Sequence, residues 1–397
     1  MSANALSTKS VISKKDVVSS HFRLGIIAGG QLGKMLAEVT NDFDISTVIM
    51  DNDDNAPASS VSKNFIKGDF KSFEDVYRFG KKVDLLTLEI EHVNIEALLK
   101  LKEEGLEIHP DPDKLKIIQD KSLQKYFFEE HGIKSSPFKS YDSFEALQKA
   151  IELKEISFPF VQKARKFGYD GKGVAVIASD QNLDLLLETP SLIEEKVDIQ
   201  KELSVIVARN ENGEVSFFEP VEMIFNESGN LVETLICPAN ISDEIKSNCI
   251  EIALKTINAL KISGVLAVEL FLTKQNEILV NEIAPRPHNS GHHTIESCIT
   301  SQFEQHIRSV LNWPLGNTGL ISSSVMLNLL GDPNAKGNVK YVGLEECLRI
   351  DGAKFHIYGK KITKPLRKMG HVTILDPDLD KALEKAQQIK LKLNITT

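Results

Sequence analysis

Three apolar segments near the start of the chain alternate with stretches of helical periodicity, and this alternation predicts a parallel β-sheet. We expect strands at residues 24–28, 47–50 and 84–89, with a glycine turn at residues 29–33 leading from the first strand into a helix. Strands that alternate with helices are joined by right-handed crossovers, so their carboxyl ends meet at one edge of the sheet. Ligands of such sheets bind at that edge.

Three polar side chains fall at this edge, Gln31, Asp51 and Glu89. A glycine turn with an acid after the second strand also fits a dinucleotide-binding site. Ala28 stands where that fingerprint has its first glycine, so the dinucleotide signal is weak. A helix N-terminus that receives some other anion needs only the glycines that are present.

A second pattern predicts a β-hairpin with one carboxylate on each strand. Residues 265–272 form an apolar run that contains Glu269, and residues 278–280 form another that leads to Glu282. If the connecting loop has an even length, the two glutamates lie opposite each other, whereas an odd length places Asn281 opposite Glu269. Two buried carboxylates repel unless a cation lies between them, and oxygen ligands suit Mg²⁺ with phosphates completing its shell. We therefore expect a metal site here.

The segment after this hairpin, residues 281–293, combines a carboxylate, a guanidinium and three imidazoles. Pro285 and Pro287 have no backbone N–H and stiffen the exit from the strand. Zinc is not favoured, because the histidines lie in a proline–glycine loop with no neighbouring cysteine. The mixture predicts a site for small polar or anionic ligands.

A glycine-rich loop at residues 165–173 separates two expected strands, residues 157–163 and 174–178. Its glycines leave backbone N–H groups free to fold around an anion, and lysines lie on and beside it, as a triphosphate requires. It is not a Walker A loop, because Gly173 follows Lys172 where serine or threonine is needed. A flexible surface hairpin is the alternative interpretation.

The last part of the chain predicts one long helix at residues 295–311, then short strands with glycine turns. We expect a closing helix that ends at Lys392, with Asp376 as N-cap and Pro377 at the first helical position. Basic residues gather before that helix, which indicates either a solvated face or a phosphate site. They are Lys360, Lys361, Lys364, Arg367 and Lys368.

Composition limits the possible function classes. The chain has 397 residues, 42% of them hydrophobic, and a formal charge of −9, which predicts a soluble protein of two or three domains without a nucleic-acid partner. No apolar run approaches the roughly 20 residues that span a bilayer, so no membrane partner is expected. The four cysteines have no CxxC spacing and fit reduced thiols in the cytoplasm. Residues 1–20 are expected to be a mobile tail, with a transit peptide as the alternative.

In sequence order, the motifs FPFVQK, GYDGKG, IEEKV, AVELF and NEIAPRPHNSGHH resemble those of the ATP-grasp enzymes, and among these the family of N5-carboxyaminoimidazole ribonucleotide synthetases. The resemblance covers residues 22–375 and departs from the family at Ala28, Phe167 and Val174. It implies a mixed α/β and α+β fold. The expected parts are a tail (1–20), a parallel-sheet domain (21–118), a lid subdomain (119–200), a central antiparallel-sheet domain (201–316) and a small β-rich domain (317–397).

The resemblance also implies a role for individual residues. ATP would be bound by Lys121, Lys163, Gly168, Tyr169, Asp170, Gly171, Lys172, Gly173, Glu194, Glu195, Lys196, Val197, Glu202, Asn281 and Glu282. Aminoimidazole ribonucleotide would be bound by Gln31, Leu32, Glu89, Tyr169, Asp170, Lys360, Arg367 and Lys368. Bicarbonate would be handled by Arg286, His288 and Asn289 as catalytic residues, and Mg²⁺, or Mn²⁺ in its place, by Glu269 and Glu282.

The activity that the resemblance implies is the ATP-dependent carboxylation of 5-aminoimidazole ribonucleotide with bicarbonate, through carboxyphosphate, in purine biosynthesis. A homodimer is the expected assembly. The nearest alternative is another ATP-grasp ligase, such as a formate-dependent glycinamide ribonucleotide transformylase, which would use the same metal, lid and phosphate sites.

Overall fold

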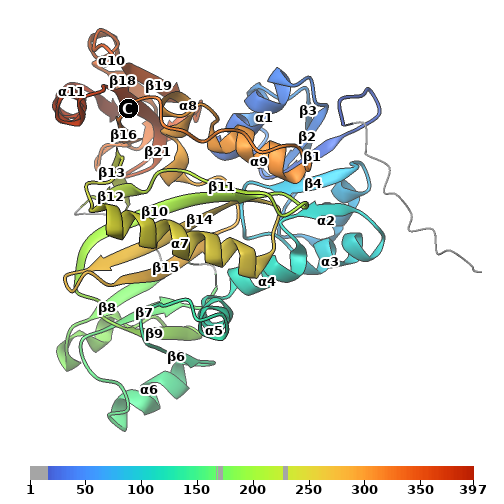
Figure 1. The fold of residues 1–397 in the computed structure, drawn as a ribbon. Helices are drawn as coiled ribbons and strands as arrows, with labels where there is room; N and C mark the ends of the chain where they lie inside the picture. The colour runs from blue at the N-terminus through green and yellow to red at the C-terminus, as the bar shows by residue number, and fades with distance from the viewer. Residues whose placement is uncertain (1–16, 167, 169–172, 227–230) are drawn as a thin grey trace, which may run out of the picture.

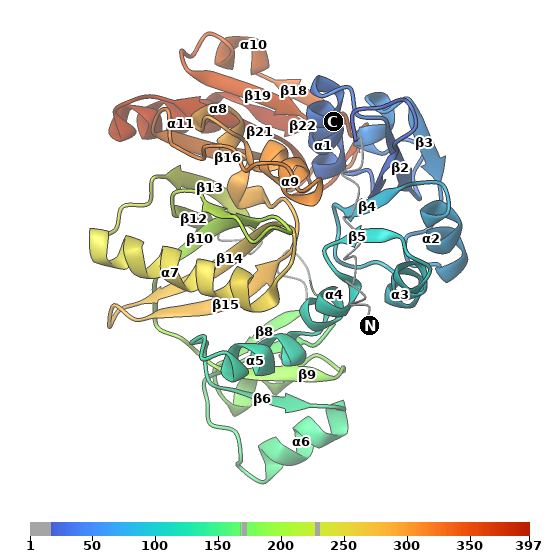
Figure 2. The same ribbon diagram turned by 45° about the vertical axis from the view of Figure 1, so that its right-hand side comes forward.

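The computed structural model describes residues 17–166, 168, 173–226 and 231–397. Figure 1 shows the N-terminal sheet on one side, the lid at the bottom, a long central sheet, and the C-terminal elements above it, and Figure 2 shows the same arrangement turned by 45°. The residues of the expected tail up to position 16 lie outside the described ranges.

The N-terminal domain is a five-stranded parallel sheet in the order β3-β2-β1-β4-β5, which confirms the prediction from alternating patterns. Every residue of β1, β2 and β4 is buried, because helices pack on the sheet. Its strands are β1 (Leu24–Ile27), β2 (Thr47–Asp51), β3 (Asn64–Lys67), β4 (Leu85–Leu88) and β5 (Glu107–His109). Its helices are α1 (Gln31–Asp42), η1 (Pro57–Ser60), α2 (Phe73–Gly80), α3 (Ile95–Glu103) and α4 (Pro112–Gln119).

The lid subdomain is a four-stranded antiparallel sheet in the order β6-β9-β7-β8. The first strand beside the glycine loop begins at Phe160, three residues later than expected, directly after Pro159, which cannot donate a backbone hydrogen bond. The elements are α5 (Lys121–Glu130), β6 (Phe138–Tyr141), α6 (Phe144–Glu152), β7 (Phe160–Ala164), β8 (Val174–Ile177), η2 (Asp180–Leu185) and β9 (Ser191–Glu195).

The central sheet has nine strands in the order β15-β14-β10-β12-β13-β16-β21-β19, with β11 paired to β10. One face of β10 and β14 packs against α7 and forms the largest apolar cluster. The elements are β10 (Ile199–Arg209), β11 (Val215–Phe217), β12 (Val221–Phe225), β13 (Val232–Cys237), α7 (Asp243–Leu260), β14 (Gly264–Thr273), β15 (Ile278–Ala284), η3 (Asn289–Gly291), α8 (Thr294–Ser297) and α9 (Gln302–Val310).

The C-terminal strands extend this central sheet, because β16 pairs with β13. The chain therefore builds one continuous sheet from residues on both sides of position 316. The elements are β16 (Ser324–Leu330), β17 (Gly337–Asn338), β18 (Lys340–Val342), α10 (Leu344–Cys347), β19 (Ala353–Ile357), β20 (Ile362–Thr363), β21 (Lys368–Leu375), α11 (Leu379–Lys392) and β22 (Asn394–Thr396).

Two helix predictions were wrong in detail. The closing helix begins at Leu379 and not at Pro377, because the Asp378 carboxylate accepts hydrogen bonds from the N–H groups of Asp380 and Lys381. The single helix expected at residues 295–311 is divided into α8 and α9. Ser301 starts the second helix by capping it. In the described ranges, none of the helices has the length and apolar character needed to cross a membrane.

Candidate active site

The hairpin of β14 and β15 places Glu269 directly opposite Glu282, as predicted. The reason given for this pairing was wrong. The N–H of Thr273 donates to the carbonyl of Glu277 at 2.9 Å, so the hairpin loop has an odd length. The register then shifts between Glu269 and Leu270, and Asn281 is the extra residue of a β-bulge. The bulge, not the loop, brings the two carboxylates together.

The bulge also turns two consecutive side chains of β15 toward lysines of the lid subdomain. Asn281 Oδ1 accepts a hydrogen bond from Lys163 Nζ at 2.8 Å. Glu282 forms an ion pair with Lys121, the first residue of α5. Although burial opposes it, the contact with Glu282 raises the pKa of Lys121. The central sheet and the lid therefore meet through the residues expected to bind ATP phosphates and metal.

A third lysine joins this network through Glu194. The two carboxylate oxygens of Glu194 lie 2.7 Å from Lys163 Nζ and 2.7 Å from Lys125 Nζ. All three residues are buried. Burial alone would raise the pKa of Glu194, but the two lysines lower it to about 2. Sequence reasoning missed Lys125, which lies one helical turn after Lys121 on α5 and so faces the same way.

The second carboxylate of the pair, Glu269, lies beside His288. Burial, with repulsion from Glu282, raises the pKa of Glu269 to about 8, so this acid is neutral at pH 7. His288 Nε2 lies 3.4 Å from Glu269 Oε1. The N–H of Ser290 donates to His288 Nδ1 at 3.3 Å, which leaves the ring proton on Nε2. Burial and nearby Arg286 lower the pKa of His288 to about 3, so the ring is neutral as well.

Arg286 reaches across to the N-terminal domain and pairs with Glu91. Its Nη2 lies 3.0 Å from Glu91 Oε1, and its Nε contacts the second oxygen of the same carboxylate. Burial would raise the pKa of Glu91, but Arg286 lowers it to about 2. Asn289 forms a reciprocal amide pair with Asn328 of β16, at 2.8 and 2.7 Å. Sequence reasoning missed Glu91, although it lies two residues beyond Glu89.

The glycine turn of the N-terminal domain is held by the acid that ends β2, Asp51, and the acid that follows β4, Glu89. Glu89 accepts hydrogen bonds from the N–H groups of Gly30 and Gly33, both at 2.8 Å, and Asp51 accepts one from Gly29 at 2.7 Å. Burial raises the pKa of Glu89 to about 7, against these bonds. A carboxylate already occupies the N-terminus of α1, so a dinucleotide phosphate would have to displace it. This geometry disfavours the dinucleotide interpretation.

Gln31 and Leu32 begin α1 beside this acid. The N-terminal domain also touches the C-terminal strands, because Lys34 Nζ donates to the carbonyl of Ile357 at 3.3 Å. The helix that begins beside Glu89 therefore contacts the strand that precedes the basic segment at residues 360–368.

The basic residues of the C-terminal region differ in their surroundings. Lys368 is half-buried, and its charge is among the causes that lower the pKa of His288, so it lies near the loop that carries His288. Lys360 Nζ donates to the carbonyl of Lys368 at 2.8 Å. Arg367 donates to the carbonyl of Ile362 at 2.6 Å. Lys361 and Lys364 are exposed.

The remaining predicted ATP ligands lie along the lid and β10. Glu195 and Lys196 are exposed and Val197 is half-buried, just after β9. Burial raises the pKa of Glu202 to about 7. Of the glycine loop, Gly168 and Gly173 are described, whereas Tyr169, Asp170, Gly171 and Lys172 lie outside the described residues. The strands on either side of the loop, β7 and β8, pair as predicted.

Comparison with protein families divides the chain into three matching parts. Residues 22–119 match the ribonucleotide synthetase preATP-grasp domain, residues 126–303 the ATP-grasp domain, and residues 324–385 the C-terminal domain of phosphoribosylaminoimidazole carboxylase. The N5-carboxyaminoimidazole ribonucleotide synthase of Bacillus subtilis is 36% identical over 375 residues, which cover 94% of this chain and 96% of that protein.

The chloroplastic phosphoribosylaminoimidazole carboxylase of Vigna aconitifolia is 37% identical over 90% of this chain, but the chain spans only 64% of that longer protein. Among solved structures, the N5-carboxyaminoimidazole ribonucleotide synthetase of Thermotoga maritima superposes with a TM-score of 0.87 at 43% identity, covering 95% of this chain and 99% of that one. The Aspergillus clavatus synthase in complex with ADP and 5-aminoimidazole ribonucleotide gives a TM-score of 0.84 at 32% identity, covering 93% and 97%. The chain therefore belongs to the N5-carboxyaminoimidazole ribonucleotide synthase family of ATP-grasp enzymes.

Proposed function

We propose that this protein uses ATP to carboxylate 5-aminoimidazole ribonucleotide with bicarbonate, giving N5-carboxyaminoimidazole ribonucleotide for purine biosynthesis. The observation that carries the proposal is the meeting of the Glu269–Glu282 pair with Lys121 and Lys163, beside the loop that holds Arg286 and His288. Relatives with this activity in their names cover nearly the whole chain.

The ATP phosphates are proposed to bind at the lysine network. Lys125 and Lys163 share the single carboxylate of Glu194, which leaves an excess of positive charge in a buried setting. Lysines satisfied in this way hold their positions before a ligand arrives, and an incoming triphosphate balances the remaining charge. Because the side chain of Glu194 is engaged by lysines, we assign adenine recognition to the backbone of residues 194–197.

Magnesium is proposed to bind between Glu269 and Glu282, and Mn²⁺ would use the same oxygen donors. The donor set fits a hard cation, because two carboxylates and the Asn281 amide oxygen lie around one bulge. Burial, with repulsion from Glu282, raises the pKa of Glu269 to about 8, and a cation bound beside this carboxyl would favour its ionised form. A bound Mg²⁺ supplies neutralisation of the charge that develops on the transferring phosphoryl group.

Bicarbonate is proposed to bind beside Arg286, His288 and Asn289. An oxygen of bicarbonate attacks the γ-phosphorus, ADP leaves, and carboxyphosphate forms. The exocyclic amine of the ribonucleotide then attacks the carboxyl carbon, and the phosphate leaves and takes up the proton that the amine loses. A histidine with a pKa near 3 is a weak base, so we assign His288 to donate a hydrogen bond from Nε2 and not to store the proton released by the amine.

The ribonucleotide is proposed to contact Gln31, Leu32 and Glu89 with its base, and Lys360, Arg367 and Lys368 with its phosphate. The neutral form of Glu89, favoured by its raised pKa, can donate a hydrogen bond as well as accept one. Tyr169 and Asp170 belong to the same proposal from the family resemblance, although they lie outside the described residues.

We extend the proposal to a homodimer in the cytoplasm. The four cysteines are free and buried, which fits a reducing compartment. Light scattering of the purified protein tests the dimer, and a fluorescent fusion tests the compartment.

The decisive experiment measures ADP formation with bicarbonate and aminoimidazole ribonucleotide each omitted in turn. Full turnover should need both, and ¹⁸O from labelled bicarbonate should appear in the released phosphate because the bicarbonate oxygen becomes bonded to phosphorus. ADP formation with formate and glycinamide ribonucleotide, in place of these substrates, would assign the alternative ligase activity.

A further inference from the structure

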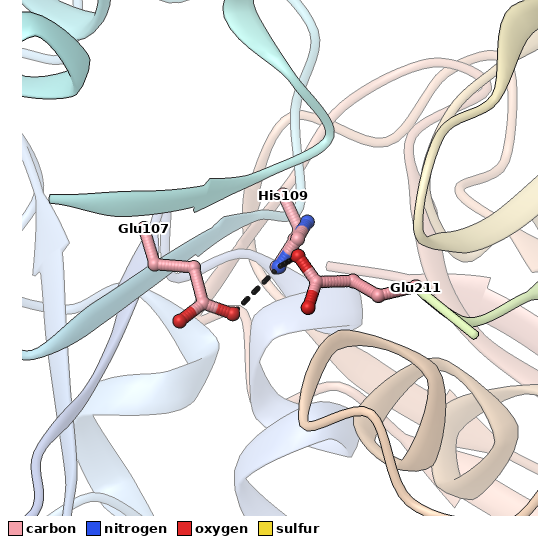
Figure 3. Close-up of side chains that lie close together, drawn as sticks. All are labelled: Glu107, His109 and Glu211. Atoms are coloured by element: carbon pink, nitrogen blue, oxygen red, sulfur yellow. Dashed lines mark hydrogen bonds and ion pairs between the residues drawn. The ribbon is translucent and has the colours of Figure 1, made fainter. Parts of the chain in front are cut away.

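A second group of potential metal ligands lies away from the proposed active site, where the N-terminal domain faces the β10–β11 hairpin. Glu107 and His109 are alternate residues of β5, so their side chains leave the strand on the same side. Glu211 comes from the turn between β10 and β11 and points at the same imidazole (Figure 3). Elements about a hundred residues apart thus converge on one nitrogen atom.

The distances between the three donor groups suit one small cation. His109 Nε2 lies 3.0 Å from Glu107 Oε1 and 3.8 Å from Glu211 Oε1, and all three ligand atoms lie within 4.8 Å of one another. Ligands about 2.0–2.2 Å from a tetrahedral zinc ion are separated by roughly 3.3–3.6 Å. In the part of the chain that the structure describes, no other three histidine, cysteine or acidic residues bring their ligand atoms this close.

Burial of the three residues also matches an open metal site. His109 is only 7% exposed, whereas the carboxylate side chains of Glu107 and Glu211 are 29% and 50% exposed. The imidazole therefore forms the floor and the two acids form the rim. A cation would reach the site from solvent, and water would complete its coordination as a fourth ligand.

The turn that carries Glu211 is anchored at several points. Asn210 Nδ2 donates to the carbonyl of Trp313 at 3.2 Å and to Glu214 at 3.1 Å. The N–H of Asn212 donates to Asn312 at 3.2 Å. None of these bonds involves Glu211, so the turn should keep its position when Glu211 is replaced.

The neighbouring His306 shows how both ring nitrogens of a histidine in this interface can find hydrogen-bond partners without a metal. Its Nδ1 accepts from the N–H of Val265 at 3.2 Å, and its Nε2 lies 2.8 Å from Thr87 Oγ1. Both ring nitrogens therefore have neutral protein partners. His109 differs because its Nε2 faces two carboxylates, and an imidazole nitrogen with two carboxylate oxygens is a ligand set for a divalent cation.

We propose that Glu107, His109 and Glu211 form a zinc site that links the N-terminal domain to the β10–β11 hairpin. One imidazole nitrogen with two carboxylate oxygens favours zinc over Mg²⁺, which prefers oxygen ligands alone. The ion would bind the folded protein and not the unfolded chain, so the free energy of unfolding would rise with the logarithm of the free zinc concentration above the Kd. This role is independent of the proposed carboxylation.

The test titrates Zn²⁺ into chelator-treated protein by calorimetry, with excess Mg²⁺ and ADP present to occupy the nucleotide site. One zinc ion should bind per chain and raise the unfolding temperature. Glu211→Gln and His109→Gln should each weaken binding by at least about tenfold, since even loss of an outer-shell partner costs this much. Glu130→Gln, an exposed glutamate at the end of α5, is the control and should bind zinc like the parent.

Location is checked by anomalous diffraction at the zinc edge from crystals with one equivalent of zinc. A peak beside His109 Nε2 is expected. An anomalous peak only at Glu269 and Glu282 would overturn the proposal, and so would wild-type zinc affinity in Glu211→Gln. The contact between His109 and Glu107 would then be a simple hydrogen bond. Because Glu211 is exposed, Glu211→Gln should fold like the parent, so its result stands without the variant of the buried His109.

Discussion

The charged residues proposed for ATP and those proposed for the ribonucleotide are held in different ways. In the first group, side chains satisfy one another across the lid and the central sheet, as Lys163 does with Asn281 and Glu194. In the second group, backbone atoms hold the side chains. Glu89 accepts from glycine N–H groups, and Lys360 and Arg367 donate to carbonyls.

This difference predicts two kinds of response to mutation. A ligand that enters the first group must exchange with existing internal partners, so changes there affect both stability and rate. A ligand that enters the second group adds contacts to side chains that keep their backbone bonds, so replacing the basic residues of this group should affect mainly affinity. The predictions that follow test this division.

The largest effect is expected for Glu282→Gln. Loss of a metal ligand should lower kcat by on the order of a thousandfold, because a catalytic metal contributes several kcal/mol to the barrier. Thermal unfolding with and without Mg²⁺ and ADP should show less stabilisation of the variant than of the parent. Glu277→Gln, on the same hairpin but in an exposed ion pair with Lys134, is the control and should retain activity. Equal stabilisation of Glu282→Gln and the parent would remove this residue from the metal site.

The hairpin around Glu282 also shows how much of the site could be predicted from the sequence. Apolar runs located both strands, and the isolated Glu269 correctly indicated a carboxylate pair. The loop-length argument failed because a bulge at Asn281 changes the register, and bulges leave no signal in hydrophobic alternation. The pairing was therefore predicted correctly while its cause was not.

Other contacts could not be predicted because nothing local encodes them. Arg286 and Glu91 are 195 positions apart, and their pairing depends on how two domains meet. The start of the closing helix was predicted wrongly for a different reason. Aspartates at 376, 378 and 380 all offer a cap, and only the structure identifies Asp378 as the one whose carboxylate accepts from the helix. The parallel sheet, by contrast, followed from patterns that extend over many residues.

The second effect concerns stability. Glu194→Gln removes the carboxylate that Lys125 and Lys163 share, and leaves two buried ammonium groups without their anion. Breaking a buried ion pair from one side costs about 3–5 kcal/mol, so urea denaturation should show a loss of that order. Glu195→Gln changes the neighbouring exposed residue and should stay within about 0.5 kcal/mol of the parent. A Glu194 variant as stable as the Glu195 variant would contradict the network.

The third effect is a pH dependence that arises from Glu89. Burial raises the pKa of this acid from 4.5 to about 7, so between these values the folded protein binds more protons than the unfolded chain. Stability should therefore fall as pH rises from about 4.5 to about 7, by on the order of 3 kcal/mol for this group. In urea denaturation at pH 5 and pH 8, Glu89→Gln should gain stability relative to the parent at the higher pH. A constant difference between the two proteins would show that Glu89 ionises normally.

The smallest effect is expected in the basic segment, where Arg367 and Lys368 are proposed to contact the ribonucleotide phosphate. A charge-assisted contact is worth about 1.5–3 kcal/mol, so Arg367→Ala with Lys368→Ala should raise KM for the ribonucleotide at least about tenfold. KM for ATP should not change, since the lysines proposed for ATP lie on the lid subdomain. Steady-state kinetics with each substrate varied in turn measures both constants.

The matched control for this pair is Lys361→Ala with Lys364→Ala, which removes the same charge from exposed positions of the same segment. If net charge alone attracts the phosphate, the two double variants should raise KM equally, and salt should abolish the difference from the parent. If contact matters, only the first should do so. Lys368→Ala alone should then raise KM for the ribonucleotide more than Arg367→Ala does, because Lys368 lies near His288 whereas Arg367 donates to the Ile362 carbonyl. A rise in KM for ATP in the Arg367→Ala, Lys368→Ala variant would instead assign this segment to the nucleotide site, and the distinction between the two groups of residues would be wrong.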